Sequence, residues 1–138
     1  MRLTSFTDYG LRMLMRMASA PERAFSTAEL AEEFGLSRHH LTKIMQSLAR
    51  ADIVTTRRGG GGGARLARPA EDIKLGQVVR TLEQGQSLVE CFAPDHGRCT
   101  LHGQCRLKAR LRSAEAAFLA HLDGSTLADV ALSALPEA

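Results

Sequence analysis

Long apolar runs, catalytic signatures and abundant cysteines are all missing from this chain of 138 residues. No apolar stretch reaches the roughly 18 residues that a membrane span requires. Residues 1–20 lack the basic segment followed by an unbroken apolar one that marks a signal peptide, so we expect a cytoplasmic protein. No catalytic Ser/His/Asp, phosphate-loop or dinucleotide pattern appears, and the sequence therefore does not favour an enzyme.

Cysteine is scarce as well. The chain has only three cysteines, and all of them fall in one short window at Cys91, Cys99 and Cys105. An odd number cannot close into a full disulfide framework. Thiols grouped at short spacing are the ligands that iron–sulfur clusters and zinc select. The gaps lack the tight Cys-x₂₋₄-Cys pair usual for zinc, which favours an iron–sulfur cluster. Redox-active thiols are the third alternative, although such switches usually pair a reactive with a resolving cysteine.

The formal net charge of +3 is unevenly distributed along the chain. Residues 1–70 carry 11 Lys/Arg and 6 Asp/Glu, whereas residues 71–138 carry 7 and 9. A basic amino-terminal half favours a polyanionic partner. A surplus of this size also occurs on ordinary charged surfaces, so the placement of the charges decides the interpretation.

Two helices are predicted before residue 36. The first starts near Thr7, after a capping pattern at residues 5–8, and ends before Pro21. The second begins at a capping pattern over residues 26–29 and is broken by Gly35. Both segments place apolar residues at helical spacing.

A third predicted helix is capped by Ser37 and is strongly amphipathic. Its apolar side has the spacing i, i+3, i+4 and i+7, formed by Leu41, Ile44, Met45 and Leu48. A short helix, a Gly-containing turn and a helix with a basic outer side predict a helix-turn-helix. The candidate DNA contacts here are Ser37, Arg38, His39, His40, Thr42 and Lys43.

A two-stranded wing is predicted next. The β-branched run 53–56 favours a strand, and residues 65–67 return as its partner before Pro69. Five glycines at 59–63 join them and allow close approach to a phosphate. Arginine suits a narrow minor groove, so the candidate wing contacts are Arg57, Arg58 and Arg65. A floppy glycine linker is the alternative.

The remaining chain predicts a short helix over 73–82, a loop over 84–104, a long helix from Cys105 and a short helix over 127–132. The long helix has an apolar seam formed by Leu107, Leu111, Ala114, Phe118 and His121/Leu122. Periodicity alone allows this seam to be a dimer surface or to pack on the chain's own core.

We therefore predict a mainly α protein with a winged helix-turn-helix domain, a cysteine-bearing cluster loop and a long C-terminal dimerisation helix. The predicted division is 1–83 for the DNA-binding domain, 84–105 for the cluster loop, and 106–138 for the dimerisation helix and tail.

The sequence resembles the NsrR family of bacterial nitric-oxide-sensing repressors over nearly its whole length. The matching segments, in the same order, are 3–12, 37–44 with the glycine-rich wing, 88–92, 105–108, 117–119 and 126–129. This resemblance implies a homodimeric winged-helix repressor of double-stranded operator DNA, without a membrane segment. Its DNA affinity would depend on an iron–sulfur cluster, with [4Fe–4S] preferred over [2Fe–2S], and nitrosylation would release the DNA.

The resemblance also implies the ligands of the cluster. The three cysteines match the family's cysteine ligands, and Asp8 matches an aspartate that serves as fourth ligand across the dimer. The sister IscR-type repressors use a histidine three residues after the last cysteine, where this chain has Lys108. Nearer along the chain, Asp95, His96 and His102 are further candidates, although we expect both histidines to be solvated.

Asp8 also has a simpler interpretation. An acidic residue early in a helix fits a capping position, and Arg12 lies four residues later, where an ion pair can form. The open functional alternatives are a winged-helix regulator with structural zinc and an iron–sulfur or redox sensor that does not respond specifically to nitric oxide.

Overall fold

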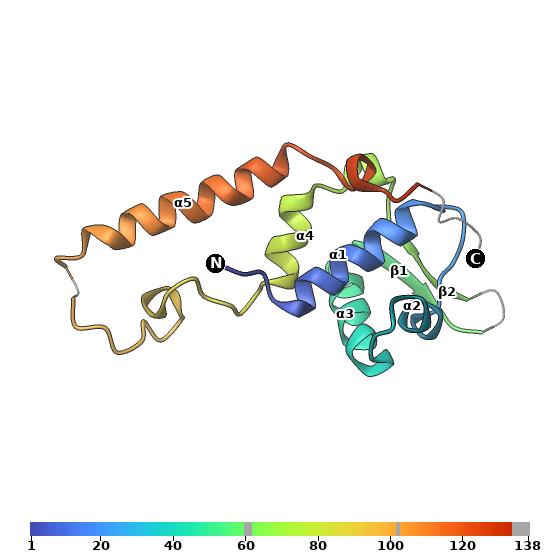
Figure 1. Cartoon of the computed structure of the whole chain (residues 1–138), viewed down its shortest axis with the longest axis horizontal. Helices are drawn as coiled ribbons and strands as arrows, with labels where there is room; N and C mark the ends of the chain where they lie inside the picture. Colours follow the sequence, from blue (N-terminus) through green and yellow to red (C-terminus); the bar gives the residue numbers. More distant parts are fainter. Residues whose placement is uncertain (60–61, 102, 134–138) are drawn as a thin grey trace.

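The computed structural model describes residues 1–59, 62–101 and 103–133. Within them lie five α-helices, a two-stranded antiparallel sheet and three 3₁₀ helices (Figure 1). The α-helices and strands, in chain order, are α1 (Ser5–Ala18), α2 (Thr27–Phe34), α3 (Arg38–Arg50), β1 (Val54–Arg57), β2 (Gly63–Leu66), α4 (Leu75–Leu82) and α5 (Arg106–Asp123). The 3₁₀ helices are η1 (Ala70–Asp72), η2 (Glu90–Phe92) and η3 (Leu127–Val130). This confirms the predicted mainly α winged-helix fold; the expectations for Gly60, Gly61, His102 and 134–138 lie outside the described residues.

Helix α1 begins earlier than predicted. Its N-cap is Thr4, whose hydroxyl oxygen accepts a hydrogen bond from the Thr7 N–H at 3.2 Å, so the helix starts at Ser5 and not near Thr7. Thr4 is held in this position by Glu83, which accepts hydrogen bonds from its N–H and its hydroxyl. The local pattern gave no sign of this partner, because Glu83 lies 79 residues away along the chain.

The helix-turn-helix forms as predicted from its local signals. Ser26 and Glu29 make a reciprocal capping box at the start of α2. Gly35 ends α2 in the left-handed region at φ +65°, where glycine is favoured, and Ser37 caps α3. The apolar side of α3 enters the core, where Leu41, Ile44 and Leu48 are fully buried. Burial of each such side chain contributes about 1.5–3 kcal/mol.

The wing is shifted by one or two residues from the predicted strands. Strand β1 pairs with β2 in the register Val54↔Leu66 to Arg57↔Gly63, so the hairpin closes on Gly63. Phe25, buried before α2, exchanges backbone hydrogen bonds with Ala64 at 2.9 and 2.7 Å. This pairing fastens the wing to the helical body.

Helix α4 starts two residues later than predicted because the preceding residues pair with the C-terminal part of the chain. Leu127 N–H donates to Ile73 at 2.8 Å, and Leu75 N–H donates to Ser125 at 3.0 Å. Leu127 is fully buried in the same core as the winged helix. The last short helix is 3₁₀ in character and ends at Val130, two residues before the predicted end.

Helix α5 extends away from the winged-helix body, and residues 84–105, the cysteine loop, run out to its amino-terminal end (Figure 1). No residue of α5 is buried, and Leu107 is 61% exposed. At its other end α5 approaches α4 closely, because a Cβ on Gly76 would lie 2.8 Å from the Leu119 carbonyl oxygen. No helix among the described residues is long and apolar enough to cross a membrane.

Candidate nucleic-acid interface and cysteine loop

The outer side of α3 carries exposed polar and basic side chains. Arg38, His39 and Lys43 are exposed, as the amphipathic pattern predicted. Ser37 is exposed too, but its hydroxyl oxygen accepts the His40 N–H as the helix cap. The Thr42 hydroxyl donates to the Arg38 carbonyl at 2.8 Å. The free polar groups on this side of the helix are therefore chiefly those of the two cations and His39.

His40 lies differently from the other candidates on α3. Its ring packs against two aromatic side chains of α1, with centroid distances of 5.9 Å to Phe6 and 5.4 Å to Tyr9. The residue is only partly exposed. The structure thus places the His40 ring in the contact between α1 and α3.

The cationic candidate DNA contacts have no acidic partners in the part of the chain that the structure describes. Among the described residues, the ion pairs are Arg12–Asp8, Arg16–Glu33, Arg23–Glu29 and Arg80–Asp123. None of them involves Arg38, Lys43, Arg57, Arg58 or Arg65, which are all exposed. These five exposed cations on α3 and the wing are therefore available to a polyanion.

One arginine near the wing has a structural role that the sequence did not reveal. Arg68 donates hydrogen bonds to the carbonyl oxygens of Asp52 and Asp72, at 2.8 and 3.3 Å, and to the side chain of Gln77 at 2.7 Å. These bonds join the base of the wing to α4. The signal was hidden because the three partners come from separate segments.

The three cysteines lie at different points of the cysteine loop. Cys91 is in η2, Cys99 follows in the loop, and Cys105 is the N-cap residue of α5. All three are free and partly exposed. In the part of the chain that the structure describes, no three His, Cys, Asp or Glu side chains are grouped closely enough to hold a metal ion. The donor set, three free thiols on one loop, fits an iron–sulfur cluster in its chemistry, but cluster binding requires the loop to draw the thiols together.

A hydrogen bond from the Arg98 N–H to the Glu90 carboxylate, at 2.7 Å, closes part of this loop. Glu90 lies beside Gly97, where φ is +62° and a Cβ would collide with the Glu90 side chain. The closure joins residues 90 and 98. Each of these residues is followed directly by a cysteine, Cys91 and Cys99 respectively. Glu90 therefore limits the separation of the first two thiols, a role that its sequence position did not suggest.

A second contact ties the cysteine loop to α5. The guanidinium carbon of Arg112 lies 4.1 Å from the centroid of the Phe92 ring, next to Cys91. Residues 96–114 contain five Lys/Arg and no Asp/Glu, although the carboxyl-terminal half as a whole is acidic. The cysteine loop and the start of α5 therefore carry a local excess of positive charge.

The structure describes two of the other candidate ligands on the loop, Asp95 and His96. The Asp95 carboxylate accepts the Gly97 N–H at 3.1 Å, which stabilises the turn. His96 is exposed, as predicted for a solvated loop residue. His102 lies outside the described residues.

Asp8 pairs with Arg12, as its spacing predicted. Both carboxylate oxygens accept from the Arg12 guanidinium, at 3.2 and 2.8 Å. The two side chains are 48% and 45% exposed. Exposed helix pairs at this spacing contribute only about 0.3–0.5 kcal/mol, so this one can be exchanged for another partner at little cost. The role of Asp8 as a cluster ligand stays a prediction.

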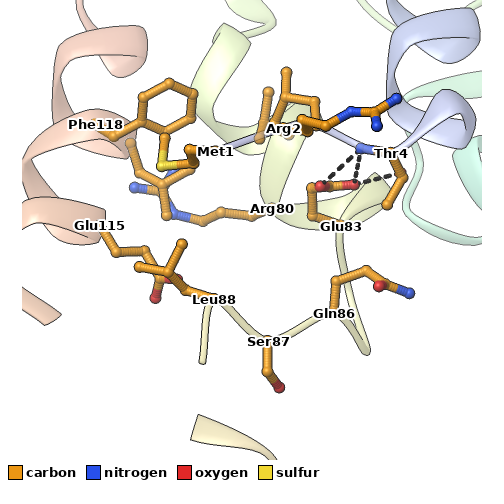
Figure 2. Close-up of a pocket in the computed structure, with 13 residues that line it drawn as sticks. Met1, Arg2, Thr4, Arg80, Glu83, Gln86, Ser87, Leu88, Glu115 and Phe118 are labelled. Atoms are coloured by element: carbon orange, nitrogen blue, oxygen red, sulfur yellow. Dashed lines mark hydrogen bonds between the residues drawn. The ribbon is translucent and has the colours of Figure 1, made fainter. Parts of the chain in front are cut away.

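The start of α1, which carries Asp8, is fixed to the end of α4 by one carboxylate (Figure 2). Glu83 accepts from the N–H and hydroxyl of Thr4 and from the hydroxyl of buried Thr7. Partial burial raises the pKa of Glu83, but the hydrogen bonds from Thr4 and Thr7 outweigh it and hold the pKa below its ordinary value.

A cavity of about 330 Å³ opens beside this carboxylate, between the chain's amino terminus, α4, residues 86–88 and α5 (Figure 2). Arg80 and Glu83 line it from α4, and Glu115 and Phe118 line it from α5. The two helices therefore separate toward the cysteine loop, although Arg80 and Asp123 hold them together at the other end with bonds of 2.9 and 2.8 Å.

The structure is thus a winged helix with exposed cations on α3 and the wing and with three free thiols on one loop. The model of the family Rrf2, described as an iron-dependent transcriptional regulator, matches residues 3–132. The chain belongs to the Rrf2 family. As an Rrf2 member it is a transcriptional regulator and not an enzyme, which confirms the prediction made from the missing catalytic motifs.

Solved structures agree with the Rrf2 assignment. CymR of B. subtilis, the global cysteine regulator, is 27% identical with a TM-score of 0.74, over 95% of this chain and 96% of that one. T. potens IscR is 27% identical with a TM-score of 0.73, over 94% of this chain and 85% of that one. The oxidized form of S. aureus CymR is 26% identical with a TM-score of 0.70, over the whole of both chains. The predicted resemblance is thus confirmed at the level of the Rrf2 family, and the NsrR-type signal stays a prediction.

Proposed function

We propose that this Rrf2 regulator is a homodimeric repressor that binds double-stranded operator DNA and senses nitric oxide through an iron–sulfur cluster. The observation that carries the proposal is the occurrence, in one Rrf2 chain, of three free thiols on a single loop and an exposed basic face without acidic partners. The thiols supply a soft-metal ligand set, and the basic face supplies contacts for DNA.

The DNA-binding part rests on α3 and the wing. Arg38, His39 and Lys43 lie on the side of α3 that enters the major groove in helix-turn-helix proteins. The remaining proposed contacts are Ser37, His40 and Thr42 on α3, and Arg57, Arg58 and Arg65 on the wing. Of these, His40 has the weakest support, because its ring packs on α1.

The cluster part rests on Cys91, Cys99 and Cys105, with Asp8 as the proposed fourth ligand reaching the partner subunit. When bound, the cluster supplies iron that reacts with nitric oxide, and we favour [4Fe–4S] over [2Fe–2S]. Cys105 occupies the N-cap of α5. Glu90 closes the loop between the other two cysteines.

A movement of Asp8 can be transmitted to α3, the proposed DNA-binding helix, because α1 and α3 are tightly packed. Asp8 and Gly10 are both in α1, and a Cβ on Gly10 would lie 3.2 Å from Ile44 of α3. Helix α1 is also bonded to Glu83 of α4. Movement of the first turn of α1 would therefore displace α3, and with it the separation of the two recognition helices in a dimer.

Dimerisation is proposed through α5. None of its residues is buried, and Leu107 near its start is 61% exposed. An apolar seam of this length on a small domain favours a second helix as its cover. A symmetric dimer then matches a roughly palindromic operator, with half-sites about one helical turn apart.

The cluster is tested by anaerobic reconstitution, with iron, sulfide and zinc counted per chain and the absorption spectrum recorded. We expect iron and sulfide with visible absorption, which Cys99→Ala abolishes and the loop control Asp95→Asn retains. Nitric oxide should lower the operator affinity of the wild-type protein. A colourless protein with stoichiometric zinc, or operator affinity unaffected by nitric oxide, would contradict the proposal.

Two matched pairs of variants test the residues. Lys43→Gln removes an unpaired cation and should weaken DNA binding by about tenfold or more, whereas Arg23→Gln removes a cation already paired with Glu29 and should have little effect. Asp8→Ala should alter the spectrum and the nitric-oxide response, but Arg12→Ala should keep both. If Asp8→Ala retains both, Asp8 is not a ligand.

A further inference from the structure

The wing contains a hollow that the contacts considered so far do not explain. It has a volume of about 270 Å³ and is lined by Ala24, Thr55, Arg57, Gly63 and Arg65. This wing hollow lies just below the range of about 300–1,000 Å³ that is typical for drug-sized ligands. It therefore suits a small group.

The register of the wing explains why the hollow exists. Arg57 is opposite Gly63, and Thr55 is opposite Arg65, so the two arginines are diagonal neighbours on one face of the hairpin. Gly63 contributes no side chain, and a Cβ there would lie 2.8 Å from the Phe25 carbonyl oxygen at φ +125°. The space beside Arg57 is thus kept empty by a position where only glycine fits.

The chemistry of the hollow selects an anion. Diagonal neighbours in an antiparallel pair are about 7–8 Å apart, a separation that one tetrahedral anion between two guanidinium groups can bridge. Neither arginine has an acidic partner among the described residues. The backbone N–H and carbonyl oxygen of Phe25 are both bonded to Ala64, so this carbonyl is not a free acceptor that would repel an anion.

We infer that the wing hollow is a phosphate site in which Arg57 and Arg65 together hold one phosphate of the DNA backbone. The inference rests on the proposed DNA binding and deepens it, because it gives Arg57 and Arg65 a different role from that of Arg58. Arg58, which follows β1 and does not line the hollow, is left to reach the groove. Phosphate contacts position a protein on the duplex but carry no sequence information.

The test uses the anaerobically reconstituted full chain and two duplexes, the tightest one selected from a random pool and an unrelated one. Arg57→Gln, Arg65→Gln and the double variant are compared with the control Arg23→Gln, which removes a cation already paired with Glu29, with thermal melting to confirm that each folds. The double variant should weaken binding to both duplexes by a similar factor, roughly tenfold to a hundredfold. The slope of log affinity against log salt should fall by about 1.8 for the dimer, the value for one phosphate in each subunit.

Two single-site results distinguish a shared phosphate from separate contacts. Single methylphosphonate substitutions in the selected duplex should reveal one position in each half-site at which the wild type loses affinity and the double variant does not. A fall of the dimer's salt slope by about 3.6, or losses of the two single variants that add fully, would mean two separate phosphates in each subunit and would overturn the inference. A loss confined to the selected duplex would also overturn it, since that pattern indicates base reading.

Inorganic phosphate tests the other source of the same group. We expect millimolar phosphate to leave the melting temperature of the wild type and the double variant equally unchanged. Phosphate stabilisation of the wild type alone, with unaltered DNA affinity of the double variant, would assign the site to a free anion and not to DNA. If the wild type binds neither duplex, the proposed function fails first; if it binds and the double variant binds equally well, only the inference fails.

Discussion

The winged-helix body and the region around the cysteine loop differ most in burial. Nearly all of the core comes from the segment between Met13 and Leu82, with Leu127 added from the end of the chain. Among the described residues between 84 and 126, none is buried. The body therefore has its own hydrophobic core, whereas the cysteine loop and the amino-terminal half of α5 are held by a few polar and stacking contacts. The region proposed to sense the signal is the one that a ligand or a second subunit can most easily reorder.

The largest effect on the free energy of unfolding is expected from a substitution in the core of the winged-helix body. Leu41→Ala removes a fully buried side chain and should lower the free energy of unfolding by about 2–5 kcal/mol. The control Leu101→Ala truncates a side chain that is 60% exposed in the cysteine loop, and should change it by no more than about 0.5 kcal/mol. Urea unfolding at one fixed protein concentration measures both. Equal losses would show that the loop belongs to the same cooperative core.

An intermediate effect is expected at Glu83, which lies at the end of α4 and accepts hydrogen bonds from the start of α1. Its pKa is lower in the folded protein than the ordinary value of 4.5, so the ionised carboxylate stabilises the fold above that pH. This stabilisation should disappear as the pH falls below 4.5 and through the lower folded pKa. Unfolding of Glu83→Gln across this range should show a smaller dependence on pH than the wild type.

Thr7→Val gives a graded control for Glu83, because it removes one of the donors to the carboxylate and leaves Thr4 in place. The change in the pH dependence should have the same sign as that of Glu83→Gln and be smaller. An unchanged pH profile in both variants would exclude Glu83 as the link that stabilises the start of α1 through its charge.

The smallest effect is expected in the cysteine loop, where the contacts are local. Glu90→Ala removes the acceptor of the Arg98 N–H, so hydrogen exchange of that amide should become faster while the urea midpoint stays unchanged. Glu90→Gln keeps an acceptor oxygen and should restore most of the protection. A shift of the urea midpoint in Glu90→Ala would contradict the independence of loop and body.

Much of the fold could be predicted because its signals are local. The capping box at Ser26, the left-handed turn at Gly35 and the spacing of apolar residues in α3 each depend on neighbours within one or two helical turns. These short-range patterns determined the helix-turn-helix. The pairing of Asp8 with Arg12 was visible for the same reason.

The tertiary structure decided whatever depends on residues distant in the chain. The start of α1 depends on Glu83, the start of α4 on the bond between Ile73 and Leu127, and the edge of the wing on Phe25. The same holds for function: the sequence placed Arg57, Arg58 and Arg65 together on the wing, but only the strand register separates the two that line the wing hollow from the third. The physical reason is that a hydrogen bond or a hollow between distant segments leaves no periodicity in either segment.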